Sequence, residues 1–127
     1  MMHHKPDDER LGMRLHEVNR QRAVDRAVER MRHGLRADWE YLTADDHANL
    51  RWIVGELWET NSREQWDALF FSKLDLHGVR RLVGIGDRLR RHGTNRVSAL
   101  EGAATIVREA HATSPELHGA EAASLVY

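Results

Sequence analysis

Arginine supplies most of the chemistry that the side chains of this sequence could perform. Seventeen of the basic residues are arginines, and only Lys5 and Lys73 are lysines. The planar guanidinium group donates paired hydrogen bonds to phosphate or carboxylate oxygens, so an arginine-rich protein is suited to bind either anion. A GC-rich coding sequence also favours arginine codons, and the composition alone leaves both explanations open.

The charges form blocks along the chain. Residues 10–36 carry eight arginines against three acids, and residues 76–100 carry six arginines against Asp87. Residues 37–75 have three basic residues against nine acids, and the formal net charge of the chain is −1. Three interpretations are open: the blocks neutralise one another within the fold, they form a two-signed surface for a partner or a second copy, or two basic helices follow a phosphate backbone.

The stretch RRLVGIGDRLRRHG, residues 80–93, sets two glycines among arginines. From Val79 onward its pattern resembles the first half of the helix-hairpin-helix motif of non-specific DNA-binding proteins, although Arg90 and Gly93 replace the residues of the second half. The resemblance implies a G-I-G turn at which backbone amides donate to phosphates. The alternative is a helix whose glycines mark a bend or admit a close neighbour. The candidate nucleic-acid-binding residues are Arg80, Arg81, Gly84, Gly86, Arg88, Arg90 and Arg91, with Arg20, Arg22, Arg26 and Arg30 of the first basic block.

Two pairs of carboxylates lie in the acidic block, Glu56 with Glu59 and Glu64 with Asp67. They are similar to the ExxE and ExxD pairs of the all-α nucleotide pyrophosphatases, and the resemblance implies a Mg²⁺ site. Only four residues separate the two pairs here, fewer than in that family. The nine histidines form neither an HExxH motif nor the ExxH motif of di-iron bundles. We predict no metal site and no cofactor.

The sequence offers little for catalysis or for membrane insertion. Cysteine is absent, and no serine lies in a GxSxG context. No apolar run reaches the roughly 18–20 residues that span a bilayer, and the first residues lack the apolar stretch of a secretory signal. We therefore predict a protein that is not an enzyme, does not associate with membranes and is located in the cytoplasm.

The helical period is the only regular spacing that recurs among the apolar residues, and it predicts an all-α fold. The expected helices run from about Asp8 to His33, from Thr43 to about Thr60, from Ser62 past Leu74, from about His77 to His92, and from about Thr94 to Ala112. We predict a compact bundle of about five helices around a Trp-rich antiparallel hairpin made by the second and third. The expected organisation is a polar N-terminal arm at residues 1–9, a single helical domain at residues 10–112, and a short helical or loosely held tail at residues 113–127.

The first expected helix carries two apolar faces that differ by roughly 140° at 100° per residue. Either this helix breaks near residues 19–22, or its halves pack against different things, one of which could be a partner subunit. We therefore predict an adaptor or regulator that binds a protein partner or self-associates, with a nucleic-acid-associated protein as the alternative. The candidate partner interface comprises Leu11, Leu15 and Val18 on one face and Val24, Val28 and Met31 on the other.

Overall fold

The computed structural model describes the backbone of residues 4–93 and 95–112, and the side chains of residues 12–93 and 95–110. Within these residues it contains only helices, so the predicted all-α fold is confirmed. The predicted tail at residues 113–127 lies outside the described part. The elements are α1 (His4–Leu35), the 3₁₀ helix η1 (Arg36–Tyr41), α2 (Ala44–Thr60), α3 (Arg63–Asp67), the 3₁₀ helix η2 (Phe71–Lys73), α4 (Leu76–His92) and α5 (Arg96–Ala112).

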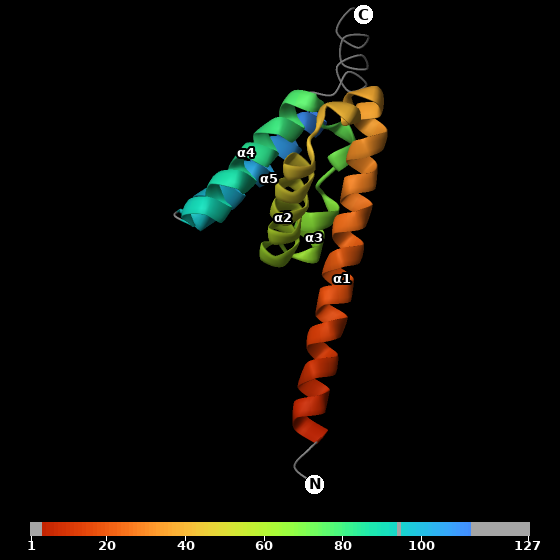
Figure 1. Cartoon of the computed structure of the whole chain (residues 1–127), viewed down its shortest axis with the longest axis vertical. Coiled ribbons are helices and arrows are strands. Elements are labelled where there is room, and N and C mark those ends of the chain that lie inside the picture. The colour runs from red at the N-terminus through yellow and green to blue at the C-terminus, as the bar shows by residue number, and fades with distance from the viewer. Residues whose placement is uncertain (1–3, 94, 113–127) are drawn as a thin grey trace, which may run out of the picture.

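Helix α2 is the centre of the fold. It begins at a capping box in which the Thr43 hydroxyl accepts from the amide of Asp46, while the Asp46 carboxylate accepts from the amide of Thr43. Its apolar positions recur with the helical period, and α2 packs against α1 on one side and α4 on the other (Figure 1). The buried apolar residues of α2 are Leu50, Ile53, Val54 and Leu57.

Helix α1 is unbroken over 32 residues, so its two apolar faces belong to one continuous helix. Its C-terminal half packs on the domain through Val24, Ala27, Met31 and Leu35, all of which are buried. The N-terminal half projects beyond the other helices (Figure 1). The helix therefore does not break near residues 19–22. Its two halves face different surroundings, which is the other possibility that the sequence left open.

The helix that follows α2 is much shorter than the sequence predicts. The capping box of Ser62 and Gln65 is present, but α3 ends at Asp67 instead of continuing past Leu74. Leu69 and Phe71 are both buried, and two residues of a helix that are two positions apart do not face the same side. The chain therefore turns into η2 to bury both, and the predicted hairpin has only one long arm.

The four tryptophans surround the core instead of filling it. Trp39, Trp52 and Trp66 are half-buried against its edge, and Trp58 is also half-buried. The fully buried side chains are aliphatic residues together with Met31 and Phe71. The core of this bundle is thus an aliphatic one, with indole rings at its rim.

Two helix ends show how glycine is used. Gly93 ends α4 as predicted, with a left-handed φ of 67° and an amide that donates to the Leu89 carbonyl. Gly34 does not end α1, because the helix continues to Leu35 and the left-handed residue is Arg36, with a φ of 54°. A side chain at position 34 would collide with the backbone of Ser72, so Gly34 allows η2 to approach α1 closely.

Helix α5 packs on α4 and α2. Leu100, Ala104 and Val107 are buried, whereas Val97 is 71% exposed. Val97 lies in the first turn of α5, directly after the loop that follows α4. The core-facing stripe of α5 therefore begins at Leu100, about one turn into the helix.

Candidate functional site

The G-I-G turn predicted at residues 84–86 is not formed. Helix α4 runs through Gly84 and Gly86 without interruption, and backbone amides inside a helix donate to carbonyls of the preceding turn. The amides near the glycines are thus engaged within the helix. A Cβ atom at position 86 would lie 2.8 Å from the Asn49 carbonyl oxygen of α2, whereas one at position 84 would meet nothing within 4 Å. Gly86 therefore admits a close neighbour, which is the alternative that the sequence left open.

Two of the arginines of α4 contact other described side chains. Arg90 donates to the Asn49 side chain at 2.9 Å and lies 5.9 Å from the centre of the Trp52 ring. Arg91 forms an ion pair with Asp87 at 2.9 Å. All five arginines of α4 are exposed, and the remaining three are Arg80, Arg81 and Arg88. The arginines that the helix-hairpin-helix resemblance grouped together thus serve different structural purposes.

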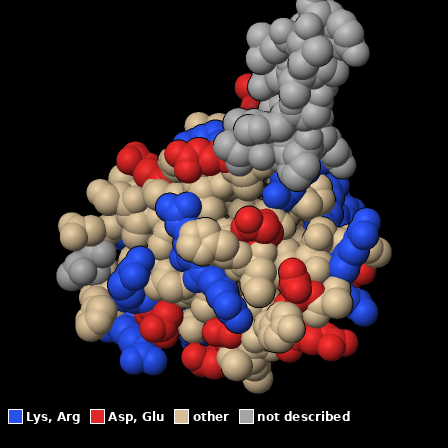
Figure 2. Space-filling view, turned by 90° about the horizontal axis from the view of Figure 1, so that it is seen from above, with Lys and Arg blue, Asp and Glu red and all other residues tan. Residues whose placement is uncertain are grey.

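The two basic helices do not lie side by side, because α2 separates α1 from α4 (Figure 1). Figure 2 shows acidic and basic side chains intermingled on the face seen from above, instead of a patch of one sign. Arginines of α1 and α5 meet acids of the central block, as in the Arg20–Glu56 pair at 3.6 Å. For these residues the charge blocks neutralise one another within the fold.

Three of the four carboxylates of the implied Mg²⁺ site meet basic side chains. The pairs are Glu56 with Arg20 and Arg96, Glu59 with Arg20 and His16, and Asp67 with Arg63. The hydrogen bond to Glu56 raises the pKa of Arg96. Among the described side chains, those of residues 12–93 and 95–110, no three from His, Asp or Glu come together in a way that could hold a metal ion.

The predicted partner interface is split by the fold. Val24 and Met31 are buried in the core of this chain, and Val28 is half-buried against it, so these three pack within the protein itself. Leu15 and Val18 are 55% and 44% exposed. The side chain of Leu11 lies outside the described part. What remains available to a partner is the face of Leu15 and Val18 on the projecting half of α1.

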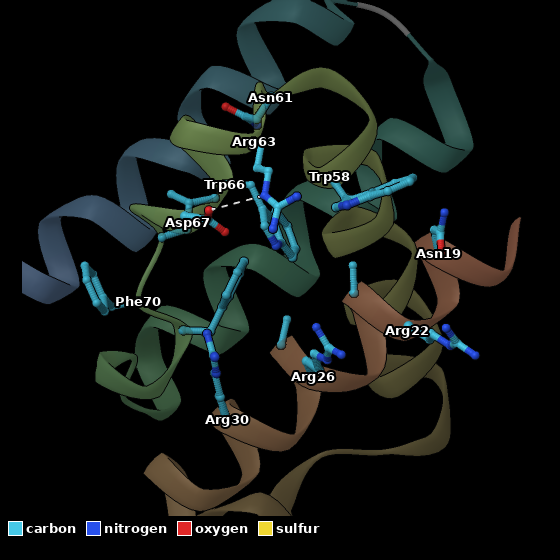
Figure 3. A pocket seen from close by; sticks show the side chains of 14 residues that line it. Asn19, Arg22, Arg26, Arg30, Trp58, Asn61, Arg63, Trp66, Asp67 and Phe70 are labelled. Atoms are coloured by element: carbon cyan, nitrogen blue, oxygen red, sulfur yellow. Dashed lines mark ion pairs between the residues drawn. The ribbon is translucent and has the colours of Figure 1, made fainter. Parts of the chain in front are cut away.

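A groove between α1 and the α2–α3 segment is lined by residues that no sequence motif relates to one another (Figure 3). Its volume is about 770 Å³. One wall is α1, which contributes Arg22, Arg26 and Arg30, and the opposite side carries aromatic rings and Arg63. The aromatic residues that line it are Trp58, Trp66, Phe70 and Phe71. The four-residue spacing of the three α1 arginines was a visible signal, but nothing in the sequence placed aromatic rings opposite them.

The acids nearest to these arginines in the sequence are occupied elsewhere. Asp25 pairs with Arg51 of α2 and accepts a hydrogen bond from Gln21, and the hydrogen bond from Arg51 lowers the pKa of Asp25. Glu29 pairs with Arg32 and His33, at 3.7 and 3.2 Å. Among the described residues, Arg22, Arg26 and Arg30 form no ion pair. The α1 wall of the groove is therefore positively charged and not neutralised by its own helix.

Comparison of the chain with protein-family models, with curated proteins and with solved structures found no match. None of the helices in the described ranges combines the length and the apolar character needed to cross a bilayer.

Proposed function

We propose that the protein is a non-enzymatic cytoplasmic adaptor or regulator that self-associates through the projecting half of α1. The observation that carries this proposal is the exposure of Leu15 and Val18 at the place where α1 leaves the domain, beside His16, which still contacts Glu59 of α2. Three positions separate these residues, so they lie on the same face of the helix. At 100° per residue this face points roughly 150° away from the face that carries Val24 and Met31.

A second copy of the chain is the partner that fits this face most simply. When two identical helices pair about a two-fold axis, the same surface is used on both subunits. In an antiparallel pair, Leu15 of one copy lies against Val18 of the other, so each apolar side chain is covered by an apolar side chain. The described part of this stripe is short, and we expect a dissociation constant in the micromolar range or weaker, since small interfaces belong to weak or transient complexes.

The proposal is tested by measuring mass against protein concentration, by sedimentation equilibrium. We expect the native chain to shift towards a dimer as concentration rises, and a Leu15→Glu/Val18→Glu variant to remain monomeric. Both residues lie outside the core, so the variant should unfold at the same temperature as the native chain. Met13→Glu is the matched control, because Met13 is 66% exposed on the same segment but points about 160° away from Leu15. A native chain that stays monomeric at millimolar concentration, or a dimer that Met13→Glu also abolishes, would contradict the proposal.

A further inference from the structure

We infer that the groove between α1 and the α2–α3 segment binds single-stranded nucleic acid. This inference does not depend on self-association, because the groove begins beyond Val18 and uses other side chains. It uses Arg22, Arg26 and Arg30 of the first basic block, which the sequence had offered as candidates, but none of the arginines of α4, a helix that α2 separates from α1 (Figure 1). Three features of the groove support it: its charge, the spacing of its arginines and its aromatic rings.

The charge of the groove is positive. Four arginines line it, and its only acid among the described lining residues is Asp67, which pairs with Arg63 at 3.8 Å. The other three arginines, on α1, form no ion pair within the described part of the chain. Guanidinium groups without an internal partner are the usual ligands of phosphate oxygens. The groove is therefore set up for an anion that carries more than one charge.

The spacing of the α1 arginines indicates that this anion is extended. Arg22, Arg26 and Arg30 follow one another at four-residue intervals, so they rise along one side of the helix in steps of about 6 Å. Together they cover about 12 Å, which is more than a single phosphate group can contact. A chain of phosphates with a regular repeat, such as a nucleic-acid backbone, can meet all three arginines in turn.

The aromatic rings supply the second half of a nucleic-acid site. Trp66 lies 5.3 Å from the ring of the buried Phe71, which holds the indole at the groove. Trp58 and Phe70 line the same groove. Figure 3 shows Trp58 and Trp66 on the α2–α3 side, Arg22, Arg26 and Arg30 along α1 on the other, and Phe70 at one end. Single-strand binding grooves combine a positive track for the backbone with aromatic rings on which unpaired bases stack. A duplex keeps its bases stacked inside, and an acidic peptide has no bases. The rings therefore favour a single strand over both.

The test is fluorescence anisotropy of a labelled oligothymidylate of about ten nucleotides, within the roughly 4–16 nucleotides that such grooves occupy. It is titrated at about 50 mM and 200 mM salt, with tryptophan emission recorded in parallel. We expect salt-sensitive binding that quenches tryptophan emission and that a duplex of the same length does not match. In an Arg22→Gln/Arg26→Gln/Arg30→Gln variant we expect affinity to fall at least tenfold. The slope of log affinity against log salt should fall by about 2, because each single-strand phosphate contact contributes about 0.7.

The matched control is Arg80→Gln/Arg81→Gln/Arg88→Gln, which removes the same charge from exposed arginines of α4 and should retain native affinity. Equal losses in the two triple variants would mean attraction by net charge alone and would overturn the inference. So would a lack of binding at low salt, or tighter binding of polyglutamate than of the oligonucleotide. Inorganic polyphosphate that binds as tightly, without quenching tryptophan, would also overturn it. Quenching that persists in the Leu15→Glu/Val18→Glu variant would show that the groove acts whether or not the chain self-associates.

Discussion

Gly86 of α4 lies directly against the carbonyl group of Asn49 in α2. A Cβ atom at position 86 would come within 2.8 Å of the Asn49 oxygen and 3.2 Å of the Ile53 Cβ atom. Neither neighbour is the end of a flexible side chain, so one of the helices would have to move. This contact explains why a glycine stands in the middle of a helix, where it costs about 1 kcal/mol relative to alanine.

The two glycines of the G-I-G sequence should therefore respond oppositely to substitution by alanine. Gly84→Ala adds a methyl group in open space, and we expect the free energy of unfolding to rise by about 0.5–1 kcal/mol. Gly86→Ala overpacks the α2–α4 contact, and we expect a loss of about 1–3 kcal/mol. Urea unfolding of both variants checks this. Equal changes in the two variants would contradict the assignment of Gly86 to close helix packing.

Asn49 is a buried polar side chain, 3% exposed, that joins α2 to α4. Its amide donates to Asp87 at 3.4 Å, and its oxygen accepts from Arg90 at 2.9 Å. Asn49→Leu removes the partner of both charged groups, and we expect the free energy of unfolding to fall by about 1–3 kcal/mol. Arg91→Gln breaks only an exposed pair with Asp87 and should change the free energy of unfolding by less than about 0.5 kcal/mol. If Arg91→Gln had a larger effect than Asn49→Leu in urea unfolding, the role given to the Asn49 side chain would be wrong.

Glu56 connects three helices, because its carboxylate pairs with Arg20 of α1 and Arg96 of α5. Its side chain is 13% exposed, whereas both arginines are partly open to solvent, so the pairs are partly screened. We expect Glu56→Gln to lower the free energy of unfolding by about 1 kcal/mol. The difference should shrink in 1 M salt, where screening acts within about 3 Å. Glu64→Gln, an equal change of charge at an exposed residue, is the control for both measurements.

Asp25 should make the stability of the protein depend on pH in the acid range. Its pKa is lowered by the hydrogen bond from Arg51, so the unfolded chain takes up this proton more readily than the folded one. The stabilisation is present above the ordinary aspartate value of about 3.9 and is lost as the pH falls through the lower, folded value. Asp25→Asn should flatten the acid limb of a plot of unfolding temperature against pH. Titration followed by carboxyl NMR should show the Asp25 pKa rising in Arg51→Gln; an unchanged value would contradict this account.

The sequence predicts those parts of the fold that follow from neighbouring residues. Leu50, Ile53 and Leu57 recur with the helical period, and they form the buried face of α2, within the helix predicted from Thr43 to about Thr60. Helices α2 and α3 also begin where the sequence places them, directly after Thr43 and Ser62, because the capping box at each start needs only residues three positions apart. Local spacing alone is sufficient for these features.

The parts that the sequence did not predict depend on residues far apart in the chain. The helix expected from Ser62 past Leu74 ends at Asp67, because Phe71 is drawn into a core made largely by other helices. The groove exists only because α3 comes to lie opposite α1, which brings Trp66 to face the arginine row. Val24 and Met31 looked like an interface because their stripe had no visible partner, and α2 and η2 supply that partner.

Because α1 is continuous, it fixes the position of its exposed stripe relative to the groove. From Val18 on the exposed stripe to Arg26 in the groove, the helix rises about 12 Å and turns about 80°. These residues belong to one uninterrupted helix without a kink-forming proline between them, so neither site can reorient without the other. The number of residues between the two sites in α1 therefore fixes the distance and the angle between a bound second copy and a bound nucleic-acid strand. Insertion of one residue there would rotate one site by about 100° relative to the other.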